Sequence, residues 1–286
     1  PISKELLSSP YELVPYISMM KCTIWFSVPS LLMYLMTMKA LSAESFLDIK
    51  YFIFGGEGYP KPELLKLYTL FSNQSQLINV YGPTECTCIC SAYRITEKDF
   101  DEMIGLPPLG ELNQNFDYCI LDERGAETNT GEICLIGPNV ASGYYNDKFL
   151  TDKSFTTLSN KKRFMKRMYR TGDIVSRKDG LLWYIGRADN QIKHMGYRIE
   201  LEEIENAIAQ HKDVDQTAVI YMRSQTTHGT IIAFVASRRL IEETDIIEKT
   251  RELLPTYMIP SKVNFLKSLP KNQNGKIDRA SLKSLL

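Results

Sequence analysis

The first third of the chain alternates between continuous apolar runs and stretches whose apolar residues recur at helical spacing. Residues 23–27, 51–54 and 77–80 are apolar runs of the kind found in parallel strands covered on both faces. Helices are predicted over 30–38 and from Pro62, which stands at the first helical position. An earlier helix is predicted from an apolar face of Leu13, Tyr16, Ile17 and Met20. The helix from Pro62 has an apolar face of Leu64, Leu67, Tyr68 and Phe71. This alternation predicts a parallel α/β sheet.

Glycine-containing polar segments follow two of these predicted strands. Gly55-Gly56-Glu57 ends the first, and Tyr81-Gly82-Pro83-Thr84-Glu85 ends the second. Ligands of open α/β sheets bind outside the carboxyl ends of the strands. We therefore expect the ligand-binding edge of the sheet at these two segments.

From about residue 106 the pattern changes to short strands separated by turns. Runs 116–121 and 132–136, with a hairpin over 174–185, predict a small β subdomain. The basic run 161–170 is interpreted as a solvated loop in preference to an anion site. Cys86, Cys88 and Cys90 recur with period two, which predicts one face of a strand and buried free thiols.

After residue 189 the pattern changes again. The sequence predicts a hairpin over 191–199, helices from 201 and over 244–254, and strands over 217–222, 231–236 and 263–266. We predict an α/β fold class with two domains. Residues 1–188 form part of a large domain, with a parallel α/β layer (1–105) and a β-rich subdomain (106–188). Residues 189–286 form a small, mobile α+β lid domain.

Composition narrows the possible partners and compartment. Lys+Arg and Asp+Glu both number 34, so bulk charge gives no reason to expect a nucleic-acid or membrane partner. Six cysteines without a Cys-x-x-Cys pair, and three histidines, argue against zinc and favour a reducing, cytoplasmic setting. The uncharged stretch 22–38 is short for a membrane span and is interrupted at Pro29. The chain opens at Pro1, so we expect it to be a piece of a longer protein.

Six motifs stand in an order that is specific to one family. They are Asn79-Val-Tyr-Gly-Pro-Thr-Glu85, Gly131-Glu-Ile to Gly143-Tyr144, Tyr169-Arg-Thr-Gly-Asp173, Gly186-Arg-Ala-Asp-Asn-Gln-Ile-Lys193, Leu254-Pro-Thr-Tyr-Met-Ile-Pro260 and Asn274-Gly-Lys-Ile-Asp-Arg279. Together they resemble the adenylation domains of nonribosomal peptide synthetases and the free-standing D-alanine–carrier protein ligases. The resemblance implies ATP-dependent activation of an amino acid as aminoacyl-AMP with release of pyrophosphate. Transfer to the phosphopantetheine thiol of a carrier protein would follow.

The resemblance also implies roles for individual residues. Lys276 matches the family's catalytic lysine, because a cation stabilises the charge that gathers where carboxylate meets phosphate. Asp173 would accept the ribose hydroxyls of ATP or AMP, and Glu85 would bind Mg²⁺. The remaining nucleotide contacts implied are Gly56, Glu57, Asn79 (purine edge), Tyr81 (adenine face), Gly82, Thr84 (phosphate), Tyr184 and Arg187. Alternatives are a solvated lysine, an Asx turn at Asp173, a core tyrosine at Tyr81 and a surface ion pair at Arg187.

Two further roles concern the small domain. Asp189 corresponds to the family's hinge, about which the lid swings between adenylation and thiol transfer. In the second state the hairpin from Lys193 to Tyr197 would replace Lys276 in the site, and Gly196 would line the channel for the carrier's arm. His194 is interpreted as a surface histidine rather than a general base.

The family's substrate-pocket positions fall on apolar or small residues, which favours a neutral or apolar amino acid. These positions are Phe26, Ile53, Gly55, Val80, Cys88 and Ile89. The D-alanine ligases carry a cysteine where Gly55 stands, which argues against D-alanine, since the glycine is expected to leave room. Each of these residues also has a plain core-packing interpretation.

Two other functions are compatible with the motifs. One is an acyl- or aryl-CoA ligase, against which Pro83 and the Leu-Pro-Thr-Tyr-Met segment argue. The other is a truncated, noncatalytic binding module. The family's phosphate loop and the motif that holds the substrate amino group are absent from residues 1–286, so this segment alone is expected to be inactive. No phosphopantetheine-attachment motif follows Arg279, so a carrier would lie on another chain or beyond Leu286.

Overall fold

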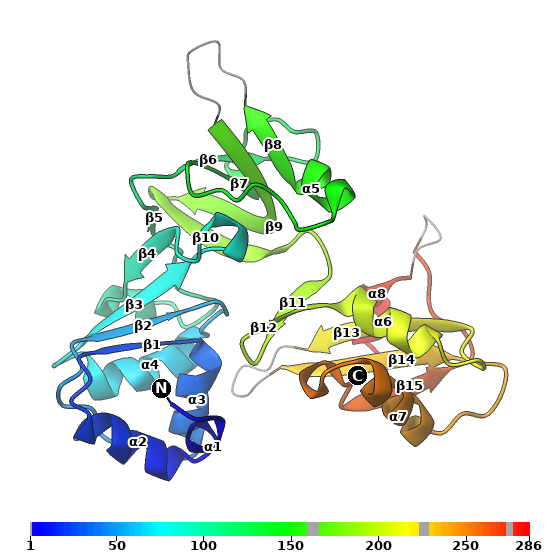
Figure 1. The fold of residues 1–286 in the computed structure, drawn as a ribbon, viewed down its shortest axis with the longest axis horizontal. Coiled ribbons are helices and arrows are strands. Elements are labelled where there is room, and N and C mark those ends of the chain that lie inside the picture. Colours follow the sequence, from blue (N-terminus) through cyan, green and yellow to red (C-terminus); the bar gives the residue numbers. More distant parts are fainter. Residues whose placement is uncertain (1, 159–165, 223–228, 273–276) are drawn as a thin grey trace. The chain divides into compact units, whose positions relative to one another are not determined.

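The computed structural model describes residues 2–158, 166–222, 229–272 and 277–286 (Figure 1). The first sheet has the order β1 (Ile24–Ser27), β2 (Tyr51–Gly55), β3 (Gln76–Tyr81), β4 (Ser91–Arg94) and β5 (Glu111–Leu112). The first three strands are parallel, as predicted, whereas β4 and β5 are antiparallel to their neighbours. The connection between β3 and β4, residues 82–90, is too short for a parallel crossover, which accounts for the mixed sheet.

Four helices precede or separate the parallel strands: α1 (Lys4–Leu7), α2 (Pro10–Met19), α3 (Pro29–Thr37) and α4 (Lys61–Phe71). The apolar faces of α2, α3 and α4 pack with Trp25, Phe52 and Leu77 in one core on one face of the sheet. On the other face Ile24 and Phe26 are 58% and 57% exposed, so within the described residues the strands are covered on one face and not on both.

Two helix-end predictions are corrected. Helix α4 begins at Lys61, so Pro62 is its second residue rather than its first. Helix α2 ends at Met19, which leaves Met20 exposed at the C-cap instead of on the buried face.

The second sheet of the first unit is antiparallel, with the order β10 (Leu181–Arg187), β9 (Lys166–Lys178), β7 (Thr130–Ile136) and β6 (Asp117–Leu121). Strand β8 (Phe155–Leu158) pairs with β9 and follows the short helix α5 (Lys148–Ser154). The predicted hairpin over 174–185 is confirmed by the β9–β10 pairing.

The interpretation of 161–170 as a loop is wrong for Lys166 to Arg170, which belong to β9; residues 161–165 lie outside the described residues. Lys166 is ion-paired with Asp117 on β6, and Arg170 with Glu132 on β7.

The prediction of a strand through the three clustered cysteines is also wrong. Residues Thr84–Cys86 form a 3-10 turn (η1), and Thr87 and Cys88 have φ values of 63° and 75°. A second 3-10 turn, η2, spans Glu97–Phe100. Cys86 and Cys90 are buried free thiols, as expected, but Cys88 is exposed. Left-handed backbone at two successive residues therefore separates positions that period-two spacing placed on one face.

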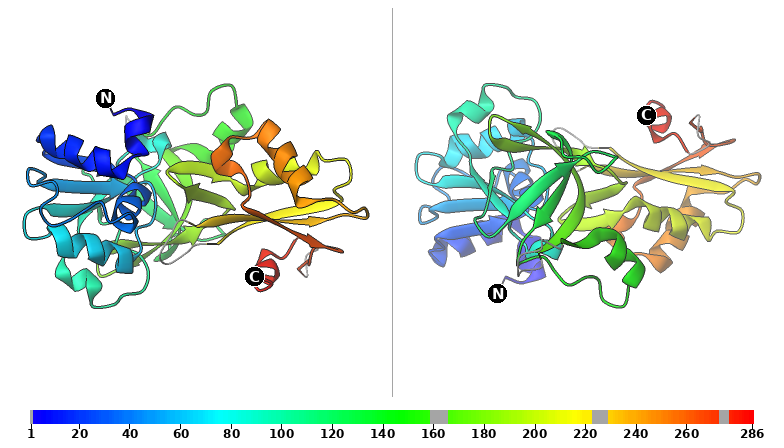
Figure 2. Two further views of the ribbon diagram at one scale, coloured as in Figure 1. Left: turned by 90° about the horizontal axis from the view of Figure 1, so that it is seen from below. Right: turned by 90° about the horizontal axis from the view of Figure 1, so that it is seen from above.

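The second unit contains the hairpin β11 (Gln191–His194) and β12 (Tyr197–Glu200), followed by α6 (Leu201–Ala209). Its sheet has the order β13 (Gln216–Met222), β14 (Thr230–Ala236) and β15 (Lys262–Leu266). Helix α6 and α7 (Glu243–Leu253) pack on one face, and α8 (Arg279–Lys283) packs on the other (Figure 2). A 3-10 turn, η3 (Thr256–Met258), precedes β15. The elements predicted after residue 189 are confirmed.

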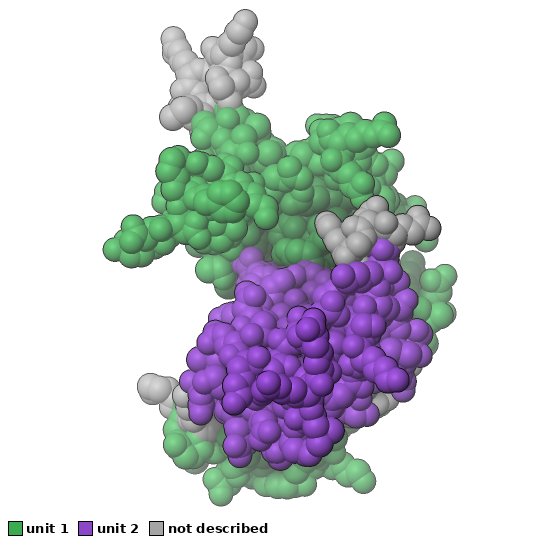
Figure 3. Space-filling view, turned by 90° about the vertical axis from the view of Figure 1, so that its right-hand side faces the viewer, with its two compact units in different colours: residues 1–189 green, residues 190–286 purple. Residues whose placement is uncertain are grey.

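The chain divides into two compact units, Pro1–Asp189 and Asn190–Leu286, which Figure 3 colours separately. The domain division predicted between residues 188 and 189 lies one residue from this boundary. Among the residues that the structure describes, none of the helices is long and apolar enough to span a membrane.

Candidate active site

Asp173 is the centre of a buried polar cluster in the first unit. The residue is 3% exposed, and its carboxylate accepts hydrogen bonds from the Tyr81 hydroxyl at 2.7 Å and from Arg187 Nη1 at 3.0 Å. The three residues lie on β9, β3 and β10, so both sheets of the unit contribute. A carboxylate this deeply buried is stable only when it is hydrogen-bonded or ion-paired, and here two donors satisfy that requirement.

The charges in this cluster are fixed by its surroundings. Burial, together with the neighbouring Asp173 carboxylate, raises the pKa of Tyr81 well above its ordinary value. Tyr81 therefore remains a hydroxyl donor at physiological pH. Burial alone would lower the pKa of Arg187, but its hydrogen bonds and ion pairs with Asp189 and Asp173 raise it.

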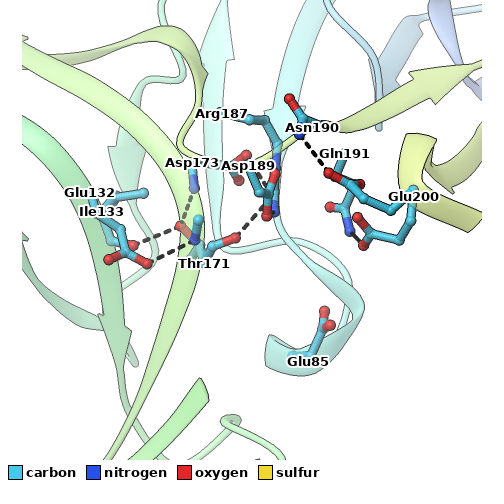
Figure 4. Close-up of polar contacts among 12 residues, drawn as sticks. Glu85, Glu132, Ile133, Thr171, Asp173, Arg187, Asp189, Asn190, Gln191 and Glu200 are labelled. Carbon is cyan, nitrogen blue, oxygen red and sulfur yellow. Dashed lines mark hydrogen bonds and ion pairs between the residues drawn. The ribbon is translucent and has the colours of Figure 1, made fainter. Parts of the chain in front are cut away.

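Arg187 joins the cluster to the end of the first unit. Its Nε and Nη2 atoms contact the two Asp189 carboxylate oxygens at 2.7 and 2.5 Å, a bidentate ion pair (Figure 4). Nη1 also donates to the Thr171 carbonyl at 2.9 Å. Gly172 has φ 72°, and a Cβ there would lie 2.6 Å from Arg187 Nη2. The glycine thus permits both the backbone turn and the close passage of the arginine.

Strand β7 holds the Thr171-Gly172-Asp173 segment of β9 through hydrogen bonds. Glu132 Oε1 accepts the Gly172 amide at 2.9 Å. The Thr171 hydroxyl donates to the Ile133 carbonyl at 2.7 Å and accepts the Asp173 amide at 3.0 Å (Figure 4). Glu132 and Thr171 have no role predicted from the sequence. Both stand inside the family motifs, at Gly131-Glu-Ile and Tyr169-Arg-Thr-Gly-Asp173, and this position was the available signal.

Glu85 lies on η1 and is 7% exposed. The Tyr144 hydroxyl donates to its Oε1 at 2.6 Å, and the Ala141 amide donates to its backbone carbonyl at 2.8 Å. Thr84, at the start of the same turn, is exposed. In the described part of the chain no three His, Cys, Asp or Glu side chains are grouped so as to hold a metal ion. The single hard oxygen donor group of Glu85 fits Mg²⁺ only where nucleotide phosphates supply further ligands.

The structure shows the surroundings of three other predicted nucleotide contacts. The Asn79 amide is buried and donates to the Pro108 carbonyl at 2.8 Å. At Gly82 an added Cβ would lie 2.1 Å from the Cys88 carbonyl oxygen, so the turn after β3 admits only glycine. Tyr184 on β10 is half-buried and packs against the core that contains Tyr81.

The glycine-glycine-glutamate segment after β2 is held mainly by backbone geometry. Gly56 has φ 85°, and Glu57 Oε2 accepts the Ser30 amide at 3.0 Å in the first turn of α3. A Cβ on Gly55 would lie 2.3 Å from the Val80 carbonyl oxygen and 2.7 Å from its Cγ2. Val80 occupies the space into which a side chain at position 55 would extend, so the interpretation that Gly55 leaves room there is wrong. The glycine instead allows β2 to approach β3.

The other predicted pocket residues differ in exposure. Val80 is buried, Ile53 and Ile89 are half-buried, and Phe26 and Cys88 are exposed. Gly55 and Val80 are therefore neighbours in the structure. That the six residues together line a substrate pocket stays a prediction.

In the second unit, Lys193 lies on β11 opposite Arg198. The hairpin turns at Met195 and Gly196, whose φ values of 52° and 82° are typical of a two-residue type I′ turn. His194 Nδ1 lies 3.2 Å from the Tyr221 hydroxyl. Lys276 lies outside the described residues.

Comparison with known proteins identifies the family. Residues 2–145 match the family described as "AMP-binding enzyme". The chain belongs to this family. Residues 203–276 match the "AMP-binding enzyme C-terminal domain".

Similar proteins include carrier-protein ligases. A D-alanine–D-alanyl carrier protein ligase of Bacillus cereus is 34% identical over 99% of this chain and 56% of its own length. The corresponding protein of Bacillus anthracis is 33% identical over 99% of this chain and 57% of its own length. The chain thus spans about half the length of the curated relatives it matches.

Two solved structures have a similar fold. Holo-PA1221, described as an NRPS protein containing adenylation and PCP domains, has 26% identity and a TM-score of 0.79, covering 97% of this chain and 47% of its own. IdnL1 has 25% identity and a TM-score of 0.81, covering 94% of this chain and 55% of its own.

Proposed function

We propose that the protein activates an amino acid with ATP, forming aminoacyl-AMP and releasing pyrophosphate, and then transfers the aminoacyl group to the phosphopantetheine thiol of a carrier protein. The observation that carries the proposal is the buried cluster of Tyr81, Asp173 and Arg187. Family membership and the carrier-protein ligases among its relatives support it. Six free cysteines favour a cytoplasmic setting.

In the proposed reaction the Asp173 cluster binds the nucleotide. A carboxylate has about four lone-pair sites, so Asp173 accepts ribose hydroxyls in addition to the bonds from Tyr81 and Arg187. Arg187 orients the carboxylate through its ion pair. Glu85 would hold the Mg²⁺ that accompanies the phosphates, and this ion would neutralise phosphate charge.

The lysines act at different stages of the proposed cycle. Lys276 stabilises the negative charge where the amino-acid carboxylate attacks the α-phosphate. For thiol transfer the second unit turns about Asp189, and the hairpin of Lys193 and Gly196 faces the carrier's arm. We propose a neutral or apolar amino acid, on the character of the predicted pocket positions.

Amino-acid-dependent exchange of labelled pyrophosphate into ATP tests this function in the full-length gene product. Exchange is expected with one or a few amino acids. Lys276→Ala is expected to lower the rate by about 100-fold or more, since removing one transition-state stabilising group has effects of that order. Lys271→Ala, an exposed lysine just upstream, is the matched control and should retain exchange.

The outcomes separate the candidate functions. Exchange with aryl or fatty acids, followed by thioester formation with coenzyme A, would replace the amino-acid proposal by an acyl- or aryl-CoA ligase. The absence of exchange with every acid tested would contradict both enzymatic functions and favour a binding module.

A further inference from the structure

Glu85 is connected to the Asp173-bearing strand through two tyrosines. The Tyr144 hydroxyl donates to Glu85 Oε1 at 2.6 Å and lies 3.2 Å from the Tyr169 hydroxyl. Tyr169 lies on β9, four residues before Asp173. Glu85 and Tyr144 are 59 residues apart in the sequence, so their contact comes from the fold alone.

The Tyr144 ring is held on several sides. It packs edge-on against Phe155 with ring centroids 5.3 Å apart, and Phe155 packs in turn against Tyr169 at 4.9 Å. The Tyr144 amide donates to the Thr151 hydroxyl at 2.9 Å. Gly143, with φ 141°, lies against the Thr151 side chain, where an added Cβ would come within 2.4 Å of Cγ2. The direction of the Tyr144 hydroxyl is therefore fixed before any ligand arrives.

The loop around Tyr144 also forms hydrogen bonds with the turn that contains Glu85. The Ala141 amide donates to the Glu85 carbonyl at 2.8 Å, and the Thr87 hydroxyl donates to the Asn139 carbonyl at 3.0 Å. Segment 139–144 thus holds the middle and the C-terminal end of η1, together with one carboxylate oxygen of Glu85.

We propose that Tyr144 is the positioning residue of Glu85, orienting the carboxylate for the Mg²⁺ that accompanies the nucleotide. The proposal rests on the metal-binding role proposed above for Glu85. A carboxylate held by a hydrogen bond on one oxygen keeps the other aimed in one direction, and partners of metal ligands commonly affect metal affinity 10- to 100-fold. Tyr144 acts through Glu85 and touches neither the nucleotide nor the reacting atoms.

The test is calorimetric titration of ATP into the full-length gene product, once with Mg²⁺ and once with EDTA. Tyr144→Phe retains the ring and removes the hydroxyl. We expect its Kd for ATP with Mg²⁺ to rise about tenfold, with no change in EDTA. Tyr145→Phe is the matched control, because this neighbouring tyrosine is 98% exposed, and it should bind as the wild type does in both conditions.

A third variant, Glu85→Gln, separates the two proposals. If it loses the Mg²⁺-dependent gain in affinity while Tyr144→Phe keeps it, the positioning role is overturned and the role of Glu85 stands. If Glu85→Gln keeps that gain, the metal role of Glu85 fails and the positioning role fails with it. Equal weakening of Tyr144→Phe with and without Mg²⁺ would mean a purely structural role and would also overturn the proposal.

A second hydroxyl deletion covers the case in which Tyr144→Phe does not fold. Tyr169→Phe removes the hydroxyl that lies beside that of Tyr144. A rise in Kd confined to the Mg²⁺ titration is expected there too, and an unchanged Kd would contradict the connection through the two tyrosines.

Discussion

Gly55 illustrates how one missing side chain sets the spacing of two strands. Replacing it by cysteine, the residue of the D-alanine ligases, would drive Cβ into the Val80 carbonyl and Cγ2. Overpacking of this kind costs about 1–3 kcal/mol. We therefore predict that Gly55→Cys lowers the free energy of unfolding by that amount, measured by urea denaturation.

Gly186→Ala provides the control for Gly55→Cys. Gly186 is a strand glycine with no atom within 4 Å of an added Cβ. A Gly55→Cys protein as stable as the Gly186→Ala protein would mean that β2 and β3 separate freely, and the residue would again be open to a pocket role.

The cysteines are predicted to differ sharply in reactivity. Cys88 is exposed on a left-handed turn, whereas Cys86, Cys90 and Cys134 are buried. Hydrogen bonding with Cys90 and burial raise the pKa of Cys86, and burial raises the pKa of Cys134 to about 12. The raised pKa values keep the Cys86 and Cys134 thiols protonated at pH 8. Iodoacetamide should therefore modify Cys88 before Cys86 and Cys134, as followed by mass spectrometry. Modification of Cys134 as fast as Cys88 would disprove this ordering.

The sequence predicted the members of the Asp173 cluster but not their bonds to one another. Tyr81 and Asp173 were assigned separate nucleotide contacts from their motifs, yet they are joined directly across 92 residues. Glu132 and Tyr144 were missed as supports for the same reason. Their roles depend on which strands and loops become neighbours, and spacing along the chain contains no such information.

At the level of elements, prediction succeeded where one face of a segment is buried and the pattern is uninterrupted. The strands at 51–55 and 76–81 followed from the apolar pattern, as did α6, α7 and the three sheet strands of the second unit, whereas α8 was not predicted. It failed where other features masked the pattern. The first residues of β9 are mostly basic, and their side chains pair with Asp117 and Glu132. The two buried residues among them, Met168 and Tyr169, therefore gave no clear strand pattern. At the three cysteines, apparent alternation spans a 3-10 turn.

The end of β10 is predicted to be held by the Arg187–Asp189 ion pair. The Ala188 amide donates to the Gly172 carbonyl at 2.8 Å, which ties this segment to the Thr-Gly-Asp turn. Asp189→Asn removes one of the two carboxylate charges that face Arg187 and leaves that of Asp173. We expect faster hydrogen exchange at the Ala188 amide, measured by NMR or mass spectrometry, since local opening becomes easier.

Asp179→Asn is a suitable comparison for the variant at Asp189. Asp179 is an exposed aspartate at φ 53° in the β9–β10 turn, where asparagine is well tolerated. Its exchange at Ala188 should equal that of the wild type. If Asp189→Asn also leaves this amide protected, the ion pair does not hold the segment that precedes the proposed hinge.

For the whole molecule, the two units carry different parts of the proposed chemistry. The first unit contains the complete Asp173 cluster and Glu85, and the second contains the Lys193 hairpin. The chain spans about half the length of its curated relatives, so the activity proposed here belongs to the full-length gene product. The order of the six motifs along the chain made it possible to predict the adenylate-forming family from the sequence. Composition alone excluded few classes of function.

The proposed function requires that Asp173 accepts the ribose hydroxyls of the nucleotide. The most direct test is a calorimetric comparison of ATP with 2′,3′-dideoxy-ATP, in the wild type and in Asp173→Asn, as a double-mutant cycle. Hydrogen bonds to a charged group contribute about 1.5–3 kcal/mol. The wild type should therefore bind dideoxy-ATP about 10- to 100-fold more weakly than ATP, and Asp173→Asn should distinguish the two far less. Equal discrimination by both proteins would contradict this role of Asp173, because the ribose hydroxyls would then be recognised elsewhere.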